Sequence, residues 1–253
     1  RYPSINQFNY MEYGVWHTFN RGVEKRNIFL DQEDYFRGVH DIYEFNDVNA
    51  AVNLQRRFYI KNKDKVESQS QNEGYPISLN FLKKQREMLM DLFTWCLMDN
   101  HYHALSSPKT KDSLAKFHQK FGIGYTNYFN LKYKRSGVLF QGKYKKVQVT
   151  NDAQLGHLIC YIHSNPLDLW KPDWKERGLN DLETQGALKF LIDKNNRWSG
   201  HQDYWGIKNF PSLINTDFLF NFFGGPEGYQ KFFIDWLKQY GKNSKFLQGM
   251  VMD

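Results

Sequence analysis

Residues 92–107 read LFTWCLMDNHYHALSS, two apolar runs on either side of a polar pair. The first run, 92–98, has the length and apolar character of a buried strand, and 102–107 fits a strand beside it. Asp99 and Asn100 separate the runs, and both residue types favour tight turns. This stretch therefore predicts two neighbouring strands joined by a turn.

Elements of both kinds precede this strand pair. A β-branched and aromatic run at 15–20 predicts a strand that ends at Arg21 and Gly22. Residues 31–46 repeat apolar side chains mostly at threes and fours and begin with acidic residues, as expected for a helix. From about 47 to 76 the chain is polar, which predicts a solvated insertion.

The residues after the pair continue the alternation of helix and strand. Residues 111–133 have a helical apolar pattern, 137–149 alternate like a strand, and 151–165 form a helix that Pro166 ends. Asn151 is the expected cap of that last helix, with Gln154 reaching back. The order is typical of an α+β fold with one antiparallel sheet covered by helices.

The last part of the chain is rich in Trp, Phe and Lys. It predicts helices at 184–194, 215–223 and 227–240. We therefore expect a domain at 1–170 and a helical C-terminal extension at 171–253.

Composition narrows the possible partners and compartment. The chain has 253 residues and a formal net charge of +7, which favours an acidic partner such as nucleic acid, although many soluble proteins are basic. Cys96 and Cys160 lie in apolar surroundings without CxxC spacing, so neither a disulfide framework nor a thiolate metal site is expected. No apolar run is long enough to span a bilayer, and residues 1–14 lack the apolar core of a signal peptide. We expect a soluble cytoplasmic protein without a membrane partner.

His101 and His103 are one residue apart on the second strand of the predicted pair. Because side chains alternate along a strand, both imidazoles point to the same face, where one metal ion can bind both. Two imidazoles by themselves favour zinc or manganese. The alternative is two ordinary polar residues at a strand end, since His-x-His pairs also arise by chance.

Tyr161 and Asn165 are four residues apart on a predicted helix, with His157 one turn earlier. This spacing places a phenol and an amide on one helix face. Taken alone, Tyr161 is better explained as a core aromatic and Asn165 as a helix-end residue before Pro166.

The order of several motifs changes that interpretation. NHYH at 100–103, LFQGKYK at 139–145 and YIHSNP at 161–166 follow one another, and the outlying matches are HTFNRG at 17–22, Ile28-Phe29, Asp34-Tyr35 and RWSGH at 197–201. In this order the motifs resemble the HUH-type single-tyrosine transposases, above all the REP-associated tyrosine transposases and the related transposases of the smallest bacterial insertion sequences. The resemblance extends from about residue 13 to 236.

The resemblance implies a ferredoxin-like α+β fold, the HUH nuclease fold, with the histidine pair on a central strand and the tyrosine on a nearby helix. It implies that Tyr161 is the nucleophile that forms a covalent 5′-phosphotyrosine. His101 and His103 would hold Mg²⁺ or Mn²⁺, and Asn165, or less favourably His157, is the expected third ligand. The expected substrate is single-stranded DNA with a hairpin, and the expected location is the nucleoid.

Three features depart from the family pattern. Asp99 stands where the family usually has proline, and the insertion at 47–76 is longer than expected. The amide after the tyrosine is Asn165 rather than the glutamine of the insertion-sequence relatives. The last departure favours the REP-associated branch, for which a helical tail and a monomer are expected, with a dimer that exchanges the tyrosine helix as the alternative.

Basic residues on the last predicted strand, and one at the turn after the first strand, are candidates for backbone contacts with DNA. They are Arg21, Lys143, Lys145 and Lys146. Lysine and arginine at such positions contact phosphates, although any one of them is as well explained as a solvated side chain.

Three other functions fit parts of the same pattern. A rolling-circle replication initiator or relaxase shares the HUH chemistry, but the single Tyr161 and the motif order disfavour it. A non-catalytic DNA-binding derivative of a transposase would keep the basic surface without turnover. A metal-dependent hydrolase would use water and leave Tyr161 structural.

Overall fold

The computed structural model describes residues 12–49 and 86–240. Its framework is a four-stranded sheet in the order β2-β3-β1-β4 with every neighbouring pair antiparallel, so the α+β prediction is confirmed. Strand, helix, two strands, helix, strand is the ferredoxin-like order. These elements are β1 (Val15–Arg21), α1 (Gln32–Phe45), β2 (Met90–Met98), β3 (His101–Pro108), α3 (Ser113–Lys132) and β4 (Lys145–Val149).

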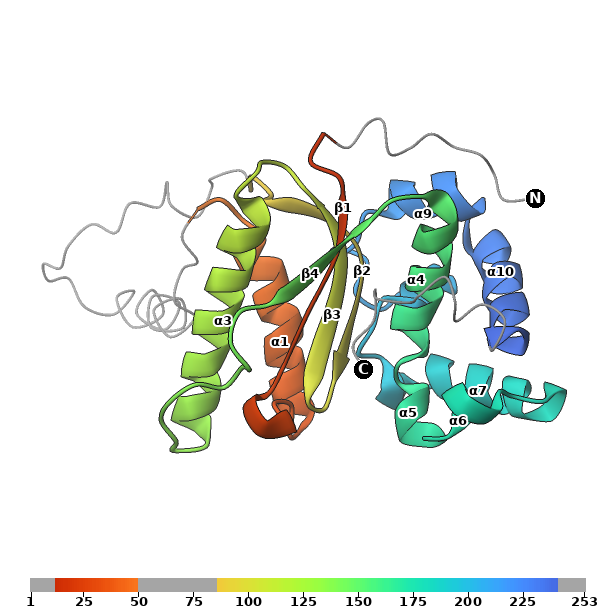
Figure 1. Cartoon of the computed structure of the whole chain (residues 1–253), viewed down its shortest axis with the longest axis horizontal. Coiled ribbons are helices and arrows are strands. Elements are labelled where there is room, and N and C mark those ends of the chain that lie inside the picture. The colour runs from red at the N-terminus through yellow and green to blue at the C-terminus, as the bar shows by residue number, and fades with distance from the viewer. Residues whose placement is uncertain (1–11, 50–85, 241–253) are drawn as a thin grey trace, which may run out of the picture.

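The two faces of the sheet have different coverings. Helices α1 and α3 lie on one face, and α4 (Asp152–Ser164) lies on the other with the C-terminal helices (Figure 1). Tyr102 of β3 points to the first face, where its ring lies 5.0 Å from that of Phe121 on α3. His103, its neighbour, points to the second face, 5.9 Å from the ring of Tyr161 on α4. The alternation along β3 is therefore as the sequence predicts.

The turn between β2 and β3 lies at Asp99 and Asn100, as predicted. The carbonyl of Asp99 accepts hydrogen bonds from the backbone N–H groups of Ile28 and Phe29, at 2.7 and 3.0 Å. The Asp99 carboxylate accepts a third, at 2.6 Å, from the hydroxyl of Tyr35 on α1. These bonds fix the start of β3, where His101 lies.

Helices α1 and α3 pack closely at Gly124, in the middle of α3. A Cβ atom at this position would lie 2.3 Å from the ring of Phe45, the last residue of α1. Glycine at this point weakens helix propensity but lets the two helices approach. The helix predicted through Gly122 and Gly124 is confirmed, and the close packing explains the glycine at position 124.

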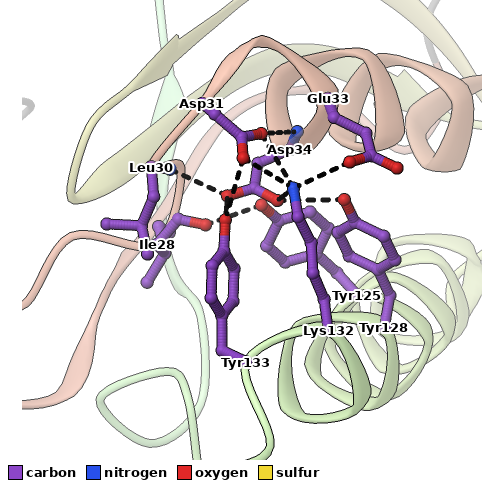
Figure 2. A network of polar contacts seen from close by, with 9 residues as sticks. All are labelled: Ile28, Leu30, Asp31, Glu33, Asp34, Tyr125, Tyr128, Lys132 and Tyr133. Carbon is purple, nitrogen blue, oxygen red and sulfur yellow. Dashed lines mark hydrogen bonds and ion pairs between the residues drawn. The ribbon is translucent and has the colours of Figure 1, made fainter.

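The ends of α1 and α3 are joined by a polar cluster that we call the Asp34 network, shown in Figure 2. Asp31 caps α1 by accepting from the backbone N–H of Asp34 at 3.0 Å. One oxygen of the buried Asp34 carboxylate accepts from the Leu30 backbone N–H and the Tyr133 hydroxyl, at 2.8 and 2.7 Å. The other accepts from the hydroxyl of Tyr128 and the ammonium of Lys132, at 2.9 and 2.8 Å. Both oxygens of this buried carboxylate are thus fully hydrogen-bonded.

The strand predicted at 137–149 is shorter in the structure, where β4 begins at Lys145. Gly142 has a φ of 72°, a left-handed conformation that interrupts an extended chain. Leu139 and Phe140 are buried from a loop, and Phe140 makes an isolated bridge with Gly22. The apolar alternation before Lys145 therefore reflects a loop packed onto the core.

Helix α4 has the predicted ends. The Asn151 side chain accepts from the backbone N–H of Gln154 at 2.9 Å, and Gln154 reaches back to accept from the N–H of Thr150 at 3.0 Å. After Asn165 the chain turns through Pro166 directly into α5 (Leu167–Trp170).

The segment after α5 is helical, and the predicted helices correspond to α7, α9 and α10. Its elements are α6 (Trp174–Arg177), α7 (Asp181–Ile192), η4 (Lys194–Asn196), α8 (His201–Tyr204), α9 (Thr216–Phe223) and α10 (Pro226–Lys238). Between η4 and α8 the chain runs along the edge of β2, because Leu97 N–H donates to Trp198 O and Gly200 N–H to Trp95 O, at 2.8 and 3.0 Å. Secondary structure alone does not assign a boundary at residue 170, so the domain division stays a prediction.

Three further expectations concern the insertion, the two cysteines and membrane-spanning segments. The predicted insertion at 47–76 lies almost entirely outside the described residues. Cys96 and Cys160 are buried free thiols, and burial raises the pKa of each. None of the helices at 12–49 and 86–240 is both long and apolar enough to span a bilayer.

Candidate active site

The histidine pair lies on β3 at the centre of the sheet. His103 pairs with Phe19 and His101 with Arg21 on the neighbouring strand β1. The two imidazole rings lie with their centroids 5.0 Å apart and nearly perpendicular. The structure therefore places both imidazoles on the face toward α4, as the alternation predicts.

A hydrogen bond to Nδ1 orients each ring. Asn100 Oδ1 lies 2.6 Å from His101 Nδ1, and because an amide oxygen only accepts, this Nδ1 carries the proton. His17 Nε2 lies 2.9 Å from His103 Nδ1. The Nε2 atom of His103 is buried and has no hydrogen-bond partner within the described part of the chain. An imidazole fixed through one nitrogen, with the other left as an acceptor, is the usual arrangement of a metal-binding histidine.

Both imidazoles are held in their neutral form. Burial, together with the nearby cations Lys175 and Arg21, lowers the pKa of His101 to about 4, and a hydrogen bond with Asn165 acts in the opposite direction. Burial, together with the charges of His101, His17 and Lys175, holds the pKa of His103 well below its usual range. Neutral imidazole is the protonation state that a metal ion requires, so the pair is ready for a metal at neutral pH.

Helix α4 presents Tyr161 and Asn165 to the pair. The Tyr161 ring meets the His103 ring edge to face at 5.9 Å. Asn165, which is buried, donates from Nδ2 to the Tyr161 carbonyl at 3.0 Å and also hydrogen-bonds His101. His157, the less favoured third ligand, instead packs its ring 6.2 Å from Phe232 of α10. The structure thus brings four predicted residues together and directs His157 to the tail.

These residues fit a divalent metal ion through a mixed donor set. Within the described residues there is no group of three His, Cys, Asp or Glu side chains that could hold an ion. The donors that remain are the two imidazoles and the Asn165 amide, which bears one oxygen. The observation that favours a metal here is the unpartnered Nε2 of His103 together with the position of His101 on the same face of β3, 5.0 Å away between ring centroids.

The sequence profile described as "Transposase IS200 like" matches residues 52–165, which include His101, His103, Tyr161 and Asn165. Over these residues the chain is similar to the IS200-like transposases. A solved structure described as "the REP associates tyrosine transposase bound to a REP hairpin" shares 13% identity, covers 62% of this chain and 68% of its own, and has a TM-score of 0.35. No curated protein sequence matches the chain.

The candidate DNA-binding residues divide between the two faces of the sheet. Lys145 pairs with Phe19 on β1, and Arg21 pairs with His101 on β3. The side chains of Lys145 and Arg21 therefore lie on the face of the histidine pair. Lys145 and Arg21 also line one cavity together with Gln141. Lys146 alternates to the opposite face, where its ammonium lies 4.5 Å from the Trp16 ring. Lys143 is exposed in the loop before β4.

Sequence reasoning missed three residues that shape the candidate site. Asn100 and His17 hold the two imidazoles, and His17 could have been found from its place beside the buried Phe19 on a predicted strand. Lys175 lies in α6, with its Nζ 5.3 Å from the centroid of the Tyr161 ring. No local pattern marks Lys175, because it reaches the site from the tail.

Tyr161 is covered in this structure. Its side chain is 3% exposed, with His103 on one side and Lys175 over the ring. A phosphate can therefore reach the phenol only after the side chains that cover it have moved.

Proposed function

We propose that this IS200-like transposase is a single-stranded DNA endonuclease and strand-transferase of the REP-associated type that acts at DNA hairpins. The observation that carries the proposal is the meeting of Tyr161 with His103 and of Asn165 with His101 between α4 and β3. The motif resemblance supplies the substrate class, single-stranded DNA with a hairpin.

In the proposed reaction, the Tyr161 oxygen attacks the phosphorus of the scissile phosphodiester. A bond forms between the phenolic oxygen and the phosphorus while the bond to the 3′ oxygen breaks. The phenol loses its proton and the departing strand gains a 3′-hydroxyl, which leaves a 5′-phosphotyrosine. The covalent bond retains the energy needed for a later 3′-hydroxyl to reverse the step, so joining requires no nucleotide cofactor.

His101, His103 and Asn165 would hold the metal ion, Mg²⁺ or Mn²⁺ by the resemblance. A divalent ion bound there supplies charge neutralisation at a non-bridging phosphate oxygen. His17 and Asn100 keep both imidazoles oriented for this task through their Nδ1 atoms. Arg21 and Lys145, on the same face, would bind the DNA backbone next to the scissile phosphate.

The tail and the oligomeric state are part of the same proposal. Residues 1–170 would form the nuclease domain and 171–253 an extension that packs against it. Because α10 and α8 pack in the same chain against α4, we expect a monomer that uses its own Tyr161. Sedimentation giving a dimer mass would contradict that expectation.

Covalent trapping tests the nucleophile. The protein is incubated with a library of labelled single-stranded hairpins and Mn²⁺, and the strands bound covalently are sequenced. We expect an adduct through the 5′ phosphate with the wild type and none with Tyr161→Phe. An adduct formed by Tyr161→Phe would show that the nucleophile is a different residue.

A matched control comes from Tyr204, which is buried on α8 and donates to the Phe93 carbonyl at 2.9 Å. Tyr204→Phe removes a hydroxyl of the same kind away from the histidine pair, so adduct formation should persist. Chelation should abolish cleavage by the wild type and added Mn²⁺ should restore it. Cleavage that persists in chelator would contradict a metal-dependent site.

A further inference from the structure

Lys175 is the residue of the tail that reaches the candidate active site. Its Nζ lies over the ring of Tyr161, 5.3 Å from the centroid. The ring of His103 lies against the same tyrosine ring, 5.9 Å away between centroids. One lysine of α6 therefore contacts the proposed nucleophile where that residue meets the histidine pair.

The position of Lys175 is fixed by a carboxylate that follows α4. Asp168 of α5 accepts from the Lys175 ammonium through Oδ2 at 2.7 Å and from the Trp174 indole N–H through Oδ1 at 2.7 Å. Trp174 itself is fully buried. The lysine and aspartate side chains are 28% and 34% exposed, so the ammonium is anchored but still in contact with solvent.

The charges around Lys175 favour an anionic ligand. Arg21 pairs with His101 across β1 and β3, so a second cation lies on the face of the sheet that carries the histidine pair. An ammonium has three N–H donors, and the bond to Asp168 accounts for one of them. A phosphate that entered next to Tyr161 would therefore come close to this ammonium.

We propose that Lys175 is a phosphate-binding catalytic residue that donates to a non-bridging oxygen of the scissile phosphate. The inference rests on the proposed function and adds to it a group supplied by the C-terminal extension. On DNA binding, the flexible lysine stem moves the ammonium from the Tyr161 ring toward the phosphate while Asp168 limits its travel. The ammonium forms no covalent bond, and it stabilises the charge that gathers on the phosphate oxygens as Tyr161 attacks.

The alternative is a purely structural role, in which Lys175 only joins α6 to α5. A partly exposed ion pair of this kind contributes little to stability. The two roles differ in one measurable respect. If Lys175 binds the scissile phosphate, its contribution to DNA binding depends on the charge of that phosphate, whereas a structural contribution does not.

A binding cycle measures the contact without relying on turnover. The Tyr161→Phe protein binds the hairpin oligonucleotide recovered by trapping, and the same oligonucleotide with an uncharged methylphosphonate at the cleavage position. We expect Lys175→Gln in this background to weaken binding of the phosphodiester roughly 10-fold, as for a charged hydrogen bond, and that of the methylphosphonate less than about 2-fold. Equal losses with the two oligonucleotides, or no loss with either, would overturn the inference.

Asp168→Asn and Lys189→Gln complete the design. Asp168→Asn removes the charge of the anchor but keeps the ammonium, so binding should be retained, whereas a structural role predicts the same loss as for Lys175→Gln. Lys189 is exposed on α7, and Lys189→Gln controls for the general loss of one positive charge. If Lys175→Gln lowers the melting temperature, Lys175→Arg replaces it in the test. This variant keeps the cation, so the difference in binding between the phosphodiester and the methylphosphonate should be the same as with Lys175.

The two proposals fail in different ways. An adduct with Tyr161→Phe would reject the proposed nucleophile whatever Lys175 does. Loss of the adduct with Tyr161→Phe, combined with equal effects of Lys175→Gln on both oligonucleotides, would reject the role of Lys175 alone.

Discussion

Two clusters of buried polar side chains lie on opposite faces of the same sheet, and they differ in how completely they are hydrogen-bonded. In the Asp34 network, both carboxylate oxygens have two partners each (Figure 2). In the cluster around His101 and His103, the buried His103 Nε2 has no partner within the described residues. The Asp34 network is completely hydrogen-bonded, whereas the histidine cluster leaves one ring nitrogen without a partner among the described residues.

The difference separates stability from function. Burial of a polar group costs free energy unless its hydrogen bonds are made, so a complete network can stabilise the fold. An incomplete one persists when it serves another purpose, and here the purpose we propose is metal binding. Substitutions in the two clusters should therefore affect different measurements.

The largest effect is expected from the incomplete cluster, on activity. His101→Asn removes one imidazole ligand at the partly exposed end of the pair, and we expect DNA cleavage to fall at least about 100-fold, since the ion supplies several kcal/mol. The free energy of unfolding without metal should change by less than about 1 kcal/mol. Quantified adduct formation tests the expected loss of cleavage, and urea denaturation tests the expected small change in the free energy of unfolding. Cleavage within 3-fold of the wild type would exclude His101 as a ligand.

Asp34→Asn should show the opposite profile. It leaves Lys132 and two tyrosine hydroxyls facing a neutral amide, and loss of one partner of a buried charge pair costs about 3 kcal/mol. Cleavage at a temperature where the variant is folded should stay close to that of the wild type. A variant of unchanged stability would show that the complete network is not what stabilises the junction of α1 and α3.

The pH dependence of stability provides a third test, through His118 on α3. Burial lowers the pKa of His118 to about 3, so the unfolded chain, with a pKa near 6.5, binds this proton first as pH falls. The stability that neutral His118 allows is thus present above about pH 6.5 and is lost as pH falls toward 3, at up to roughly 1.4 kcal/mol per pH unit. In the His118→Gln variant, the free energy of unfolding measured by urea denaturation should depend less steeply on pH between 6 and 4.5. An unchanged pH dependence would contradict the assignment.

The smallest effect is expected from a pair of adjacent lysines. Lys145 lies on the face of the histidine pair and Lys146 on the opposite face. Lys145→Gln should weaken binding of a single-stranded hairpin about 3-fold to 5-fold, and Lys146→Gln less than 2-fold, because one phosphate contact is worth little by itself. Equal losses would show that DNA binds both faces of the sheet.

Local patterns were sufficient for most of the fold. The runs at 15–20, 92–98 and 102–107 and the helices at 31–46 and 151–165 have periodicities that depend on the backbone alone, and each has its counterpart in the structure. The strand predicted at 137–149 was too long, because loop residues buried against the core also alternate. Turn geometry at Gly142, which no pattern reveals, ends the extended segment.

The sequence by itself determined the order of elements and, through the spacing of His101 and His103, that the two imidazoles share a face. Tertiary structure decided what that face meets: Tyr161 and Asn165 on α4, His17 from the neighbouring strand, and Lys175 from the tail. The reason is physical. Backbone geometry sets periodicity over a few residues, whereas contacts between distant segments depend on how the whole chain packs.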